Sequence, residues 1–195
     1  MSIDSVKELR LRTQASLRDC QKALDEAGGD LEKAVKLLRA RGQSIAEQKA
    51  GRVASAGTVA AYVHGNGVLG VLVELRCETD FVARSEQFKA LAHDLALHIA
   101  AAAPRYKTKE DIPQEVIEEE KQIIVQEFEK SGKPAHIIDK IAEGKISALA
   151  KEIVLLEQPF VKNPDQTVTE LIAEAVGKFG EKIEIGHFAR ITAGE

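Results

Sequence analysis

The feature that most restricts the fold is a pair of strand-like segments, 58–64 and 68–78, separated by Gly65-Asn66-Gly67. Glycine and asparagine tolerate the positive φ angles of a tight hairpin turn, so the two segments are predicted to pair as antiparallel strands. Apolar and polar residues alternate along the second segment, which predicts one buried and one outward face. The residues assigned to the buried face are Leu69, Val71, Val73, Leu75 and Cys77.

Helices that could cover this hairpin follow it in the sequence. Apolar residues recur at helical spacing from Phe88 onward, and breakers such as Pro104 and Pro134 separate the periodic segments. Helices are expected over about 85–103, 114–130, 134–156 and 167–179. The third of these should be interrupted near Gly144. The hairpin and the helices together predict the α+β class, with helices packed on a small antiparallel sheet.

The C-terminal segment, 182–192, adds one more predicted strand. Ile183, Ile185 and Ile191 alternate along it as inward residues, and Gly186 is a candidate β-bulge that shifts the inward face. We therefore expect this strand to join the hairpin in one sheet.

Three short helices are predicted before the hairpin, within 5–41. Their expected first turns carry Ser5 with Glu8, Ser16 with Asp19, and Asp30. Gly28-Gly29 should end the second helix and Gly42 the third. About forty residues bury little surface, so this trio is interpreted as an interaction module that is only marginally stable alone.

The predicted domains are a helical partner-binding module at 1–42, a polar, partly helical linker at 43–56, and the core with a dimerisation region at 57–195.

Composition limits the classes of partner. The net charge is −4 with both signs interspersed, which argues against a direct nucleic-acid partner because phosphate binding demands a basic face. The two cysteines lie far apart and match no metal-ligand spacing, so a reduced protein of the cytoplasm is expected. No leader-like or membrane-spanning apolar run is found, which predicts a soluble chain without a membrane partner.

The glycine-rich loop 65–71 fits the dinucleotide-binding fingerprint and the glycine loop of protein kinases. Its context favours a plain hairpin turn. A dinucleotide site needs a helix to begin in the loop, whereas an alternating strand follows it. The kinase interpretation lacks the downstream lysine, His-Arg-Asp and Asp-Phe-Gly motifs. A nucleotide-binding enzyme remains a rival hypothesis that predicts saturable nucleotide binding to this chain alone.

Other residues with reactive side chains form no recognisable centre. Cys77 alternates with core positions and is expected to be a small core residue. The histidines show no metal-ligand spacing, and their individual roles are left open: His64, His93, His98, His136 and His187. The sequence therefore predicts no catalytic residues, no metal site and no cofactor.

The segment from Cys77 to Arg84 follows the second strand and carries Asp80 beside Phe81 on a predicted turn. A phenylalanine there either folds under the next helix or projects into a partner's pocket. Taken alone it would be interpreted as buried, because most phenylalanine side chains are. The string Glu78-Thr79-Asp80-Phe81-Val82-Ala83-Arg84 changes that interpretation.

This string resembles the signature of elongation factor Ts, the nucleotide exchange factor of the translational GTPase elongation factor Tu. Further strings resemble the same family in the family's order: Glu8-Leu9-Arg10-Leu11-Arg12-Thr13, Asp19-Cys20-Gln21-Lys22-Ala23-Leu24, Gly70-Val71-Leu72-Val73-Glu74-Leu75, His98-Ile99-Ala100, Ser131-Gly132-Lys133-Pro134, Ile141-Ala142-Glu143-Gly144-Lys145 and Gln158-Pro159-Phe160-Val161. One departure lies in the first inter-helix turn, where Gln14 and Ser16 stand in place of the family's usual glycines, which restricts the turn to ordinary backbone angles.

The resemblance implies a function and its residues. A three-helix, UBA-like module would grip the G domain of elongation factor Tu through Leu9, Arg10, Arg12 and Thr13. Thr79, Asp80, Phe81 and Val82 would reach its nucleotide site, where Phe81 enters an apolar pocket and Asp80 disturbs the Mg²⁺ environment. The chain would then promote GDP release without being a conventional enzyme.

The resemblance also implies a homodimer, with the later helices and last strand as candidate interface. The alternative is a non-catalytic adaptor, which would form a complex without changing the partner's nucleotide affinity.

Overall fold

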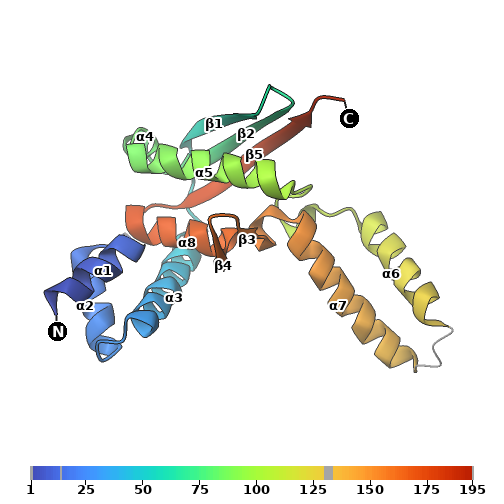
Figure 1. Cartoon of the computed structure of the whole chain (residues 1–195), viewed down its shortest axis with the longest axis horizontal. Coiled ribbons are helices and arrows are strands. Elements are labelled where there is room, and N and C mark those ends of the chain that lie inside the picture. Colours follow the sequence, from blue (N-terminus) through green and yellow to red (C-terminus); the bar gives the residue numbers. More distant parts are fainter. Residues whose placement is uncertain (1, 14, 130–133, 195) are drawn as a thin grey trace. The chain divides into compact units, whose positions relative to one another are not determined.

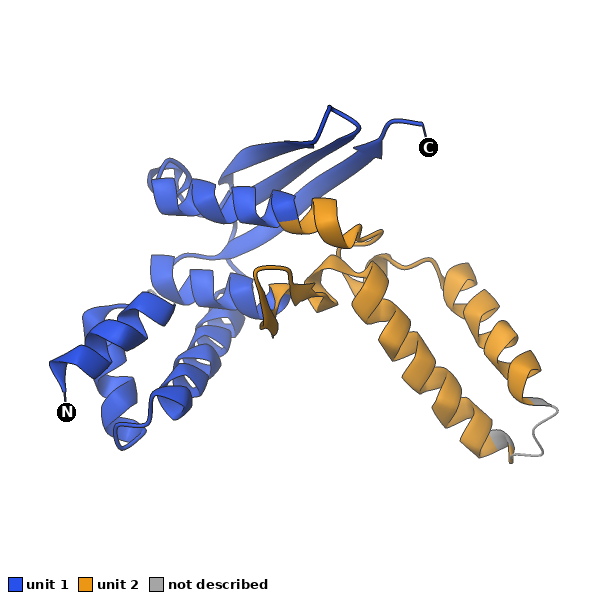
Figure 2. Ribbon diagram, in the orientation of Figure 1, with its two compact units in different colours: residues 1–97, 169–195 blue, residues 98–168 orange. Residues whose placement is uncertain are grey.

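A computed structural model describes residues 2–13, 15–129 and 134–194. The chain divides into two compact units, residues 1–97 with 169–195, and residues 98–168 (Figure 2). The described residues have the predicted α+β layout, with helices at the N-terminus and a small antiparallel sheet. Gln14 and the 131–133 part of one family-like string lie outside the described residues. Among the residues described, no helix is both long and apolar enough to cross a membrane.

The first unit begins with the three predicted helices, α1 (Ile3–Thr13), α2 (Leu17–Glu26) and α3 (Leu31–Lys49). Two of the predicted caps are confirmed: the side chain of Ser16 accepts from Asp19 N, and that of Asp30 accepts from Lys33 N. Gly28 and Gly29 follow α2 with positive φ angles, as the predicted stop requires. Apolar side chains from all three helices form a local core of Val6, Leu9, Cys20, Ala23, Leu24 and Ala34.

Two predicted helix boundaries in this region are wrong. The first helix starts at Ile3, before Ser5, and the Ser2 hydroxyl accepts from Asp4 N. The third helix continues past Gly42 to Lys49, through part of the predicted linker. A Cβ placed on Gly42 would lie 3.0 Å from the Ala173 carbonyl oxygen, so this glycine permits a close helix crossing and does not end α3.

The sheet of the first unit contains β1 (Ala56–His64), β2 (Leu69–Cys77) and β5 (Ile183–Thr192), in the order β1-β2-β5 with antiparallel neighbours (Figure 1). The hairpin turn is confirmed, because Gly65 and Gly67 have φ angles of 58° and 86°. On β2, the predicted inward residues Val71, Val73, Leu75 and Cys77 are buried.

A register shift interrupts the pairing of β2 with β5 between Val73 and Leu75. Their partners are Phe188 and Ile185, so β5 holds an extra residue beside Gly186, where the bulge was predicted. The bulge reverses the alternation of the strand. Ile191 therefore faces outward and is 70% exposed, which corrects its prediction as an inward residue.

Two helices of the first unit, α5 (Glu86–Ala102) and α8 (Val168–Phe179), lie on the same side of this sheet (Figure 1). The Phe88 and Phe179 rings meet edge to face, with centroids 5.8 Å apart. Phe88, Leu95 and Val176 are buried together with the inward face of β2. The predicted α5 stripe is thus the face that covers the sheet.

The second unit contains a helical hairpin of α6 (Gln114–Glu129) and α7 (Ala135–Ile153). The α7 helix runs without a break through Gly144, so the predicted interruption is wrong. An exposed glycine costs a helix only about 1 kcal/mol, which the rest of α7 outweighs. Short 3₁₀ turns, Lys109–Asp111 and Leu155–Glu157, flank this hairpin, followed by a two-stranded sheet of β3 (Pro159–Phe160) and β4 (Asn163–Thr167).

His98 is fully buried in the second unit, which gives a structural role to one of the histidines left open by the sequence. Its Nδ1 accepts from Val161 N at 3.2 Å, so Nε2 must carry the proton that is donated to Gln158 Oε1 at 3.0 Å. The Gln158 amide in turn donates to the carbonyl of Ala102. Burial lowers the pKa of His98, and these bonds suit the neutral ring.

We expect His98 to make the protein less stable as the pH falls below the unfolded histidine pKa of about 6.5. The folded pKa lies below the unfolded value of about 6.5, so the unfolded chain gains a proton more readily as pH falls. The contribution of neutral His98 to the free energy of unfolding is therefore fully present above the unfolded pKa. It is lost as the pH falls from there through the folded pKa. Urea unfolding at several pH values should show this fall. His98→Gln should flatten it, whereas His136→Gln, at an exposed position of α7, should not. Equal slopes in all three proteins would refute this role.

Candidate functional site

The Asp80–Phe81 pair lies on a separate helical turn, α4 (Asp80–Ala83), between β2 and α5. The sequence predicted a plain turn here and missed this helix. Thr79 is its N-cap, because the Thr79 hydroxyl accepts from Val82 N at 3.4 Å. Glu86 then begins α5 after a short break. The site is therefore a capped helical turn at the end of the central strand.

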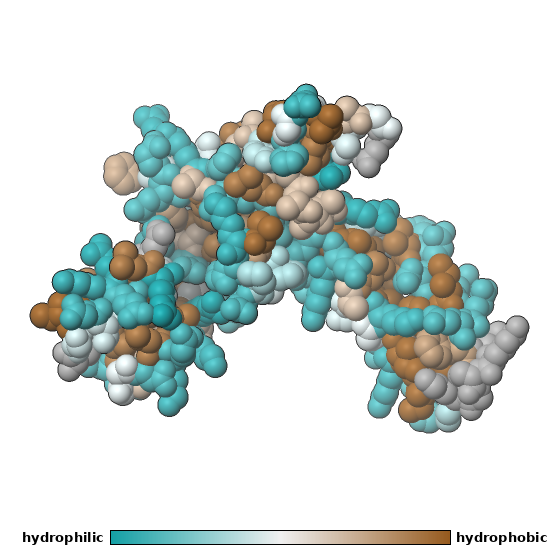
Figure 3. Space-filling model, in the orientation of Figure 1, coloured by the Kyte–Doolittle hydropathy of each residue, from teal (hydrophilic) through white to brown (hydrophobic). Residues whose placement is uncertain are grey.

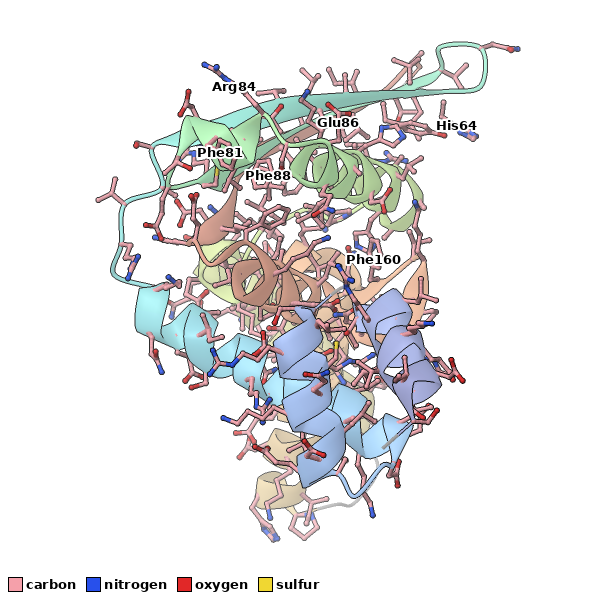
Figure 4. All side chains as sticks on the ribbon, turned by 90° about the vertical axis from the view of Figure 1, so that its left-hand side faces the viewer. His64, Phe81, Arg84, Glu86, Phe88 and Phe160 are labelled. Carbon is pink, nitrogen blue, oxygen red and sulfur yellow. The ribbon has the colours of Figure 1, made fainter. Side chains whose placement is uncertain are left out.

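The side chains of α4 divide between the core and the surface. Val82 and Ala83 are each 7% exposed and attach the turn to the first unit, whereas Phe81 is 84% exposed. Figure 4 labels Phe81 and Arg84 around α4, with Phe88 further along on α5. The exposure of Phe81 excludes the alternative in which this ring folds under the next helix. Val82, which was also predicted to meet a partner, is buried and anchors the turn in the free chain. Its contact with a partner stays a prediction.

The Asp80 carboxylate is exposed beside Phe81. Its ion-pair partner is Arg84, with Nη2 3.0 Å from Oδ2 and both side chains more than 70% exposed. An exposed pair of this kind contributes at most about 1 kcal/mol. Asp80 can therefore leave Arg84 for another cation or donor at little cost.

Cys77 lies directly under this turn and is buried, as its position in the strand predicted. Its thiol donates to the carbonyl of Thr79 at 3.1 Å. Burial raises the pKa of the Cys77 thiol, with the nearby Glu181 carboxylate acting in the same direction. The protonated thiol is thus a small core group that supports the turn.

Two glutamates hold the base of the turn: Glu78, which belongs to the family-like string, and Glu181, which the sequence did not indicate. The Glu181 carboxylate accepts from Thr79 N and Thr79 Oγ1, and the Glu78 carboxylate accepts from Lys182 N. This backbone N–H is the main reason that the pKa of Glu78 is lowered. Glu181 is 102 residues from Thr79, so no local pattern in the sequence could have revealed the contact.

The four residues predicted on the N-terminal module differ in accessibility. Leu9 and Thr13 are buried in the module, where Thr13 Oγ1 donates to the carbonyl of Leu9. Arg12 is on the surface and pairs with Glu8 and Glu32, and Arg10 is exposed. In the free chain a partner can reach the two arginines directly, whereas Leu9 and Thr13 support the surface from within.

Exposed apolar side chains on the module were also missed. Leu11 is 81% exposed, Ile3 74% and Leu17 49%. In Figure 3 apolar residues interrupt the polar surface of the N-terminal helices. Leu11 falls outside the helical stripe of Val6, Leu9 and Thr13, and that mismatch was the available signal.

The glycine-rich loop stays a hairpin turn that continues into β2, without the helix N-terminus on which a dinucleotide site depends. Within the described part of the chain, no group of three or more His, Cys, Asp or Glu residues is arranged to hold a metal ion.

The comparison with known proteins agrees with the family-like strings. The family model described as "Elongation factor TS" matches residues 4–195. This chain belongs to the elongation factor Ts family. Elongation factor Ts of Carboxydothermus hydrogenoformans is 53% identical over 190 residues, covering 97% of this chain and 88% of that protein. The proteins of the same name from Coprothermobacter proteolyticus and Thermosipho melanesiensis are 52% and 49% identical over 195 residues, which is all of this chain and 99% and 100% of theirs.

Membership of the elongation factor Ts family gives the chain a role in translation elongation. The similarity extends over most or all of the length of each of these three relatives. The exposed residues of α4 and of the N-terminal module are the candidates for contact with a partner.

Phe81 and Phe88 offer a matched test of that geometry, because they are seven positions apart and oppositely exposed. We expect Phe81→Ala to change the free energy of unfolding by no more than about 0.5 kcal/mol. Phe88→Ala should lower it by about 3–5 kcal/mol, because Phe88 is fully buried. Urea denaturation followed by circular dichroism measures both. A comparable loss in the two variants would contradict an exposed Phe81.

Proposed function

We propose that this chain binds elongation factor Tu in its GDP-bound form and promotes release of GDP during translation elongation. The observation that carries the proposal is the exposed Phe81 ring beside Asp80, on a turn anchored by Val82 and Ala83. A large apolar side chain held out on a rigid support is suited to enter a partner's pocket. Family membership supports elongation factor Tu as that partner.

Phe81 and Asp80 would act on different parts of the partner's nucleotide site. Entry of the phenyl ring into an apolar pocket would stabilise a conformation of elongation factor Tu that holds GDP weakly. The Asp80 carboxylate would disturb the environment of the bound Mg²⁺. If this chain weakens the binding of GDP and Mg²⁺ to elongation factor Tu by some factor, thermodynamic linkage sets the reverse effect. GDP and Mg²⁺ must then weaken the binding of this chain to elongation factor Tu by the same factor.

This mechanism makes and breaks no covalent bond. The chain would lower the barrier to GDP release through binding energy alone, and would itself be recovered when GTP re-forms the partner's nucleotide site. We therefore propose a nucleotide exchange factor that acts without catalytic residues or a cofactor of its own.

The N-terminal module would supply a second contact with the same partner. Leu11 and Leu17 expose apolar surface, and Arg10 adds positive charge nearby. Two contacts on one chain raise the effective concentration of each for its own site. The module would thus hold elongation factor Tu while α4 acts on the nucleotide site.

A homodimer is proposed from the outer face of the three-stranded sheet. Strand register aligns Val63, Gly70 and Ile191 in one row, and Ala61, Leu72 and Ala189 in the next. Val63, Leu72 and Ile191 are 65%, 51% and 70% exposed. A second copy would cover these apolar rows with the same rows of its own, as a two-fold interface requires.

Charges on the same outer face suit a self-complementary contact. Glu74 and Arg76 lie beyond the apolar rows and carry opposite charges in one hydrogen-bonded pair. The bond from Arg76, followed by that from His187, lowers the pKa of Glu74 to about 2, so the carboxylate is ionised at neutral pH. The proposed dimer face therefore combines an apolar centre with paired charges.

Release of a fluorescent GDP from elongation factor Tu, with Mg²⁺ present and this chain substoichiometric, tests the exchange proposal. We expect acceleration with turnover, and a loss of about tenfold or more for Phe81→Ala, because interface anchors typically contribute 2 kcal/mol or more. Asp80→Ala should also slow release. Val161→Ala, at another exposed apolar position, should keep the full rate.

A complex without acceleration would replace the exchange proposal by the adaptor. Full activity of Asp80→Ala would remove the Mg²⁺ part of the mechanism. Failure of the wild-type chain to bind elongation factor Tu would remove both functions.

The dimer proposal predicts that Leu72→Asp dissociates the chain. A carboxylate in the middle of the apolar rows would be buried without a partner in the dimer. Sedimentation equilibrium should show a dimer for the wild type and a monomer for Leu72→Asp with an unchanged circular dichroism spectrum. Ile123→Asp, at an exposed position of α6, should remain dimeric. Dissociation by Ile123→Asp alone would move the interface to the later helices.

A further inference from the structure

We propose that Glu181 is a positioning residue that sets the orientation of the Asp80–Phe81 turn. This inference rests on the exchange function proposed above and adds a residue outside the family-like signature. Glu181 follows α8 and Gly180, whose φ of 69° directs the chain from the helix toward β5. Its side chain is half-buried, and its carboxylate reaches the beginning of α4.

The Glu181 carboxylate makes three hydrogen bonds at the base of the turn. Oε2 accepts from Glu78 N at 3.1 Å and from Thr79 N at 3.0 Å, while Oε1 accepts from Thr79 Oγ1 at 2.6 Å. One carboxylate thus holds two consecutive backbone N–H groups and one hydroxyl. Hydrogen bonds to an ionised acceptor are stronger than neutral ones, so this contact fixes the backbone direction as the chain leaves β2.

The bond to the Thr79 hydroxyl also determines how α4 is capped. A hydroxyl has a single proton, and here that proton is donated to Glu181. The lone pairs of Thr79 Oγ1 are then left to accept from Val82 N, which is the capping bond of α4. Glu181 therefore controls the turn through Thr79 without contacting Asp80 or Phe81 directly.

A second set of contacts keeps the strands together independently of Glu181. The Glu78 carboxylate accepts from Lys182 N at 2.6 Å and from Arg52 Nη1 at 3.2 Å. Val82 and Ala83 remain buried as apolar anchors. Loss of Glu181 should consequently loosen the direction of the turn while the β2–β5 pairing and the fold persist.

The test compares Glu181→Ala and Glu181→Gln with the wild type in the GDP-release assay over a range of chain concentrations. Glu181→Ala should lower the maximal stimulated rate about tenfold, while the half-saturating concentration changes little because the N-terminal module still binds. Glu181→Gln should recover part of the rate, because its amide oxygen can replace one accepting oxygen. Glu184→Ala is the matched control, since the Glu184 carboxylate pairs with Lys182 Nζ and should leave the rate unchanged.

Amide hydrogen exchange by NMR supplies a readout that is independent of the partner. The amides of Glu78 and Thr79 should exchange faster in Glu181→Ala, with unchanged protection in the β1–β2 ladder and an unchanged unfolding midpoint. Thr79→Val should slow GDP release, and combining it with Glu181→Ala should add little, as expected for two groups that act through one contact.

The outcomes separate this inference from the exchange proposal. An inactive wild type would refute the exchange function itself. An active wild type with an equally active Glu181→Ala would overturn the positioning role of Glu181. A fall of the unfolding midpoint in step with activity would show that Glu181 is merely structural.

Discussion

Burial of the inward face of β2 is the constraint on which the first unit depends. β2 is the central strand, so its backbone pairs on both edges while Val73 and Leu75 lose all contact with solvent. α5 covers this face through Phe88, and α8 meets Phe88 through Phe179. Because the strand is held on two edges and one face, the residues that follow its end emerge at a fixed point. The exposed ring of Phe81 is therefore presented by one of the most constrained segments of the chain.

Much of this architecture could be predicted from local patterns. The hairpin needs positive φ at Gly65 and Gly67, and the alternation along β2 sets its buried face, so both features are written in adjacent residues. The caps at Ser16 and Asp30 have the same local character. Some predictions failed because a distant contact decided the outcome. Gly42 resembles a helix stop in sequence but packs against Ala173, a residue that no local window contains.

The candidate site also has a part that the local sequence indicates and a part that only the folded structure reveals. Asp80 and Phe81 could be found in the sequence because they belong to a family-like string, but that string does not tell which side chains face outward. Val82, Leu9 and Thr13 are buried, although each was assigned to partner binding. The Glu181 carboxylate comes from the other end of the chain, just before the β5 strand that pairs with β2. The base of the turn is thus built from two segments that lie 102 residues apart in the sequence.

Because of the extra residue in β5, the apolar side chains in its two halves face opposite sides of the sheet. Before the bulge, Ile183 and Ile185 contribute to the interior, and after it Ile191 lies on the opposite side of the sheet. One extra residue beside Gly186 thus decides which side of the sheet each later side chain of β5 faces. Insertion or deletion of one residue there would exchange inside and outside for everything downstream, including the buried guanidinium atom of Arg190. A change of chain length at this point would therefore alter both faces of the strand, whereas a substitution along the end of β5 alters a single side chain.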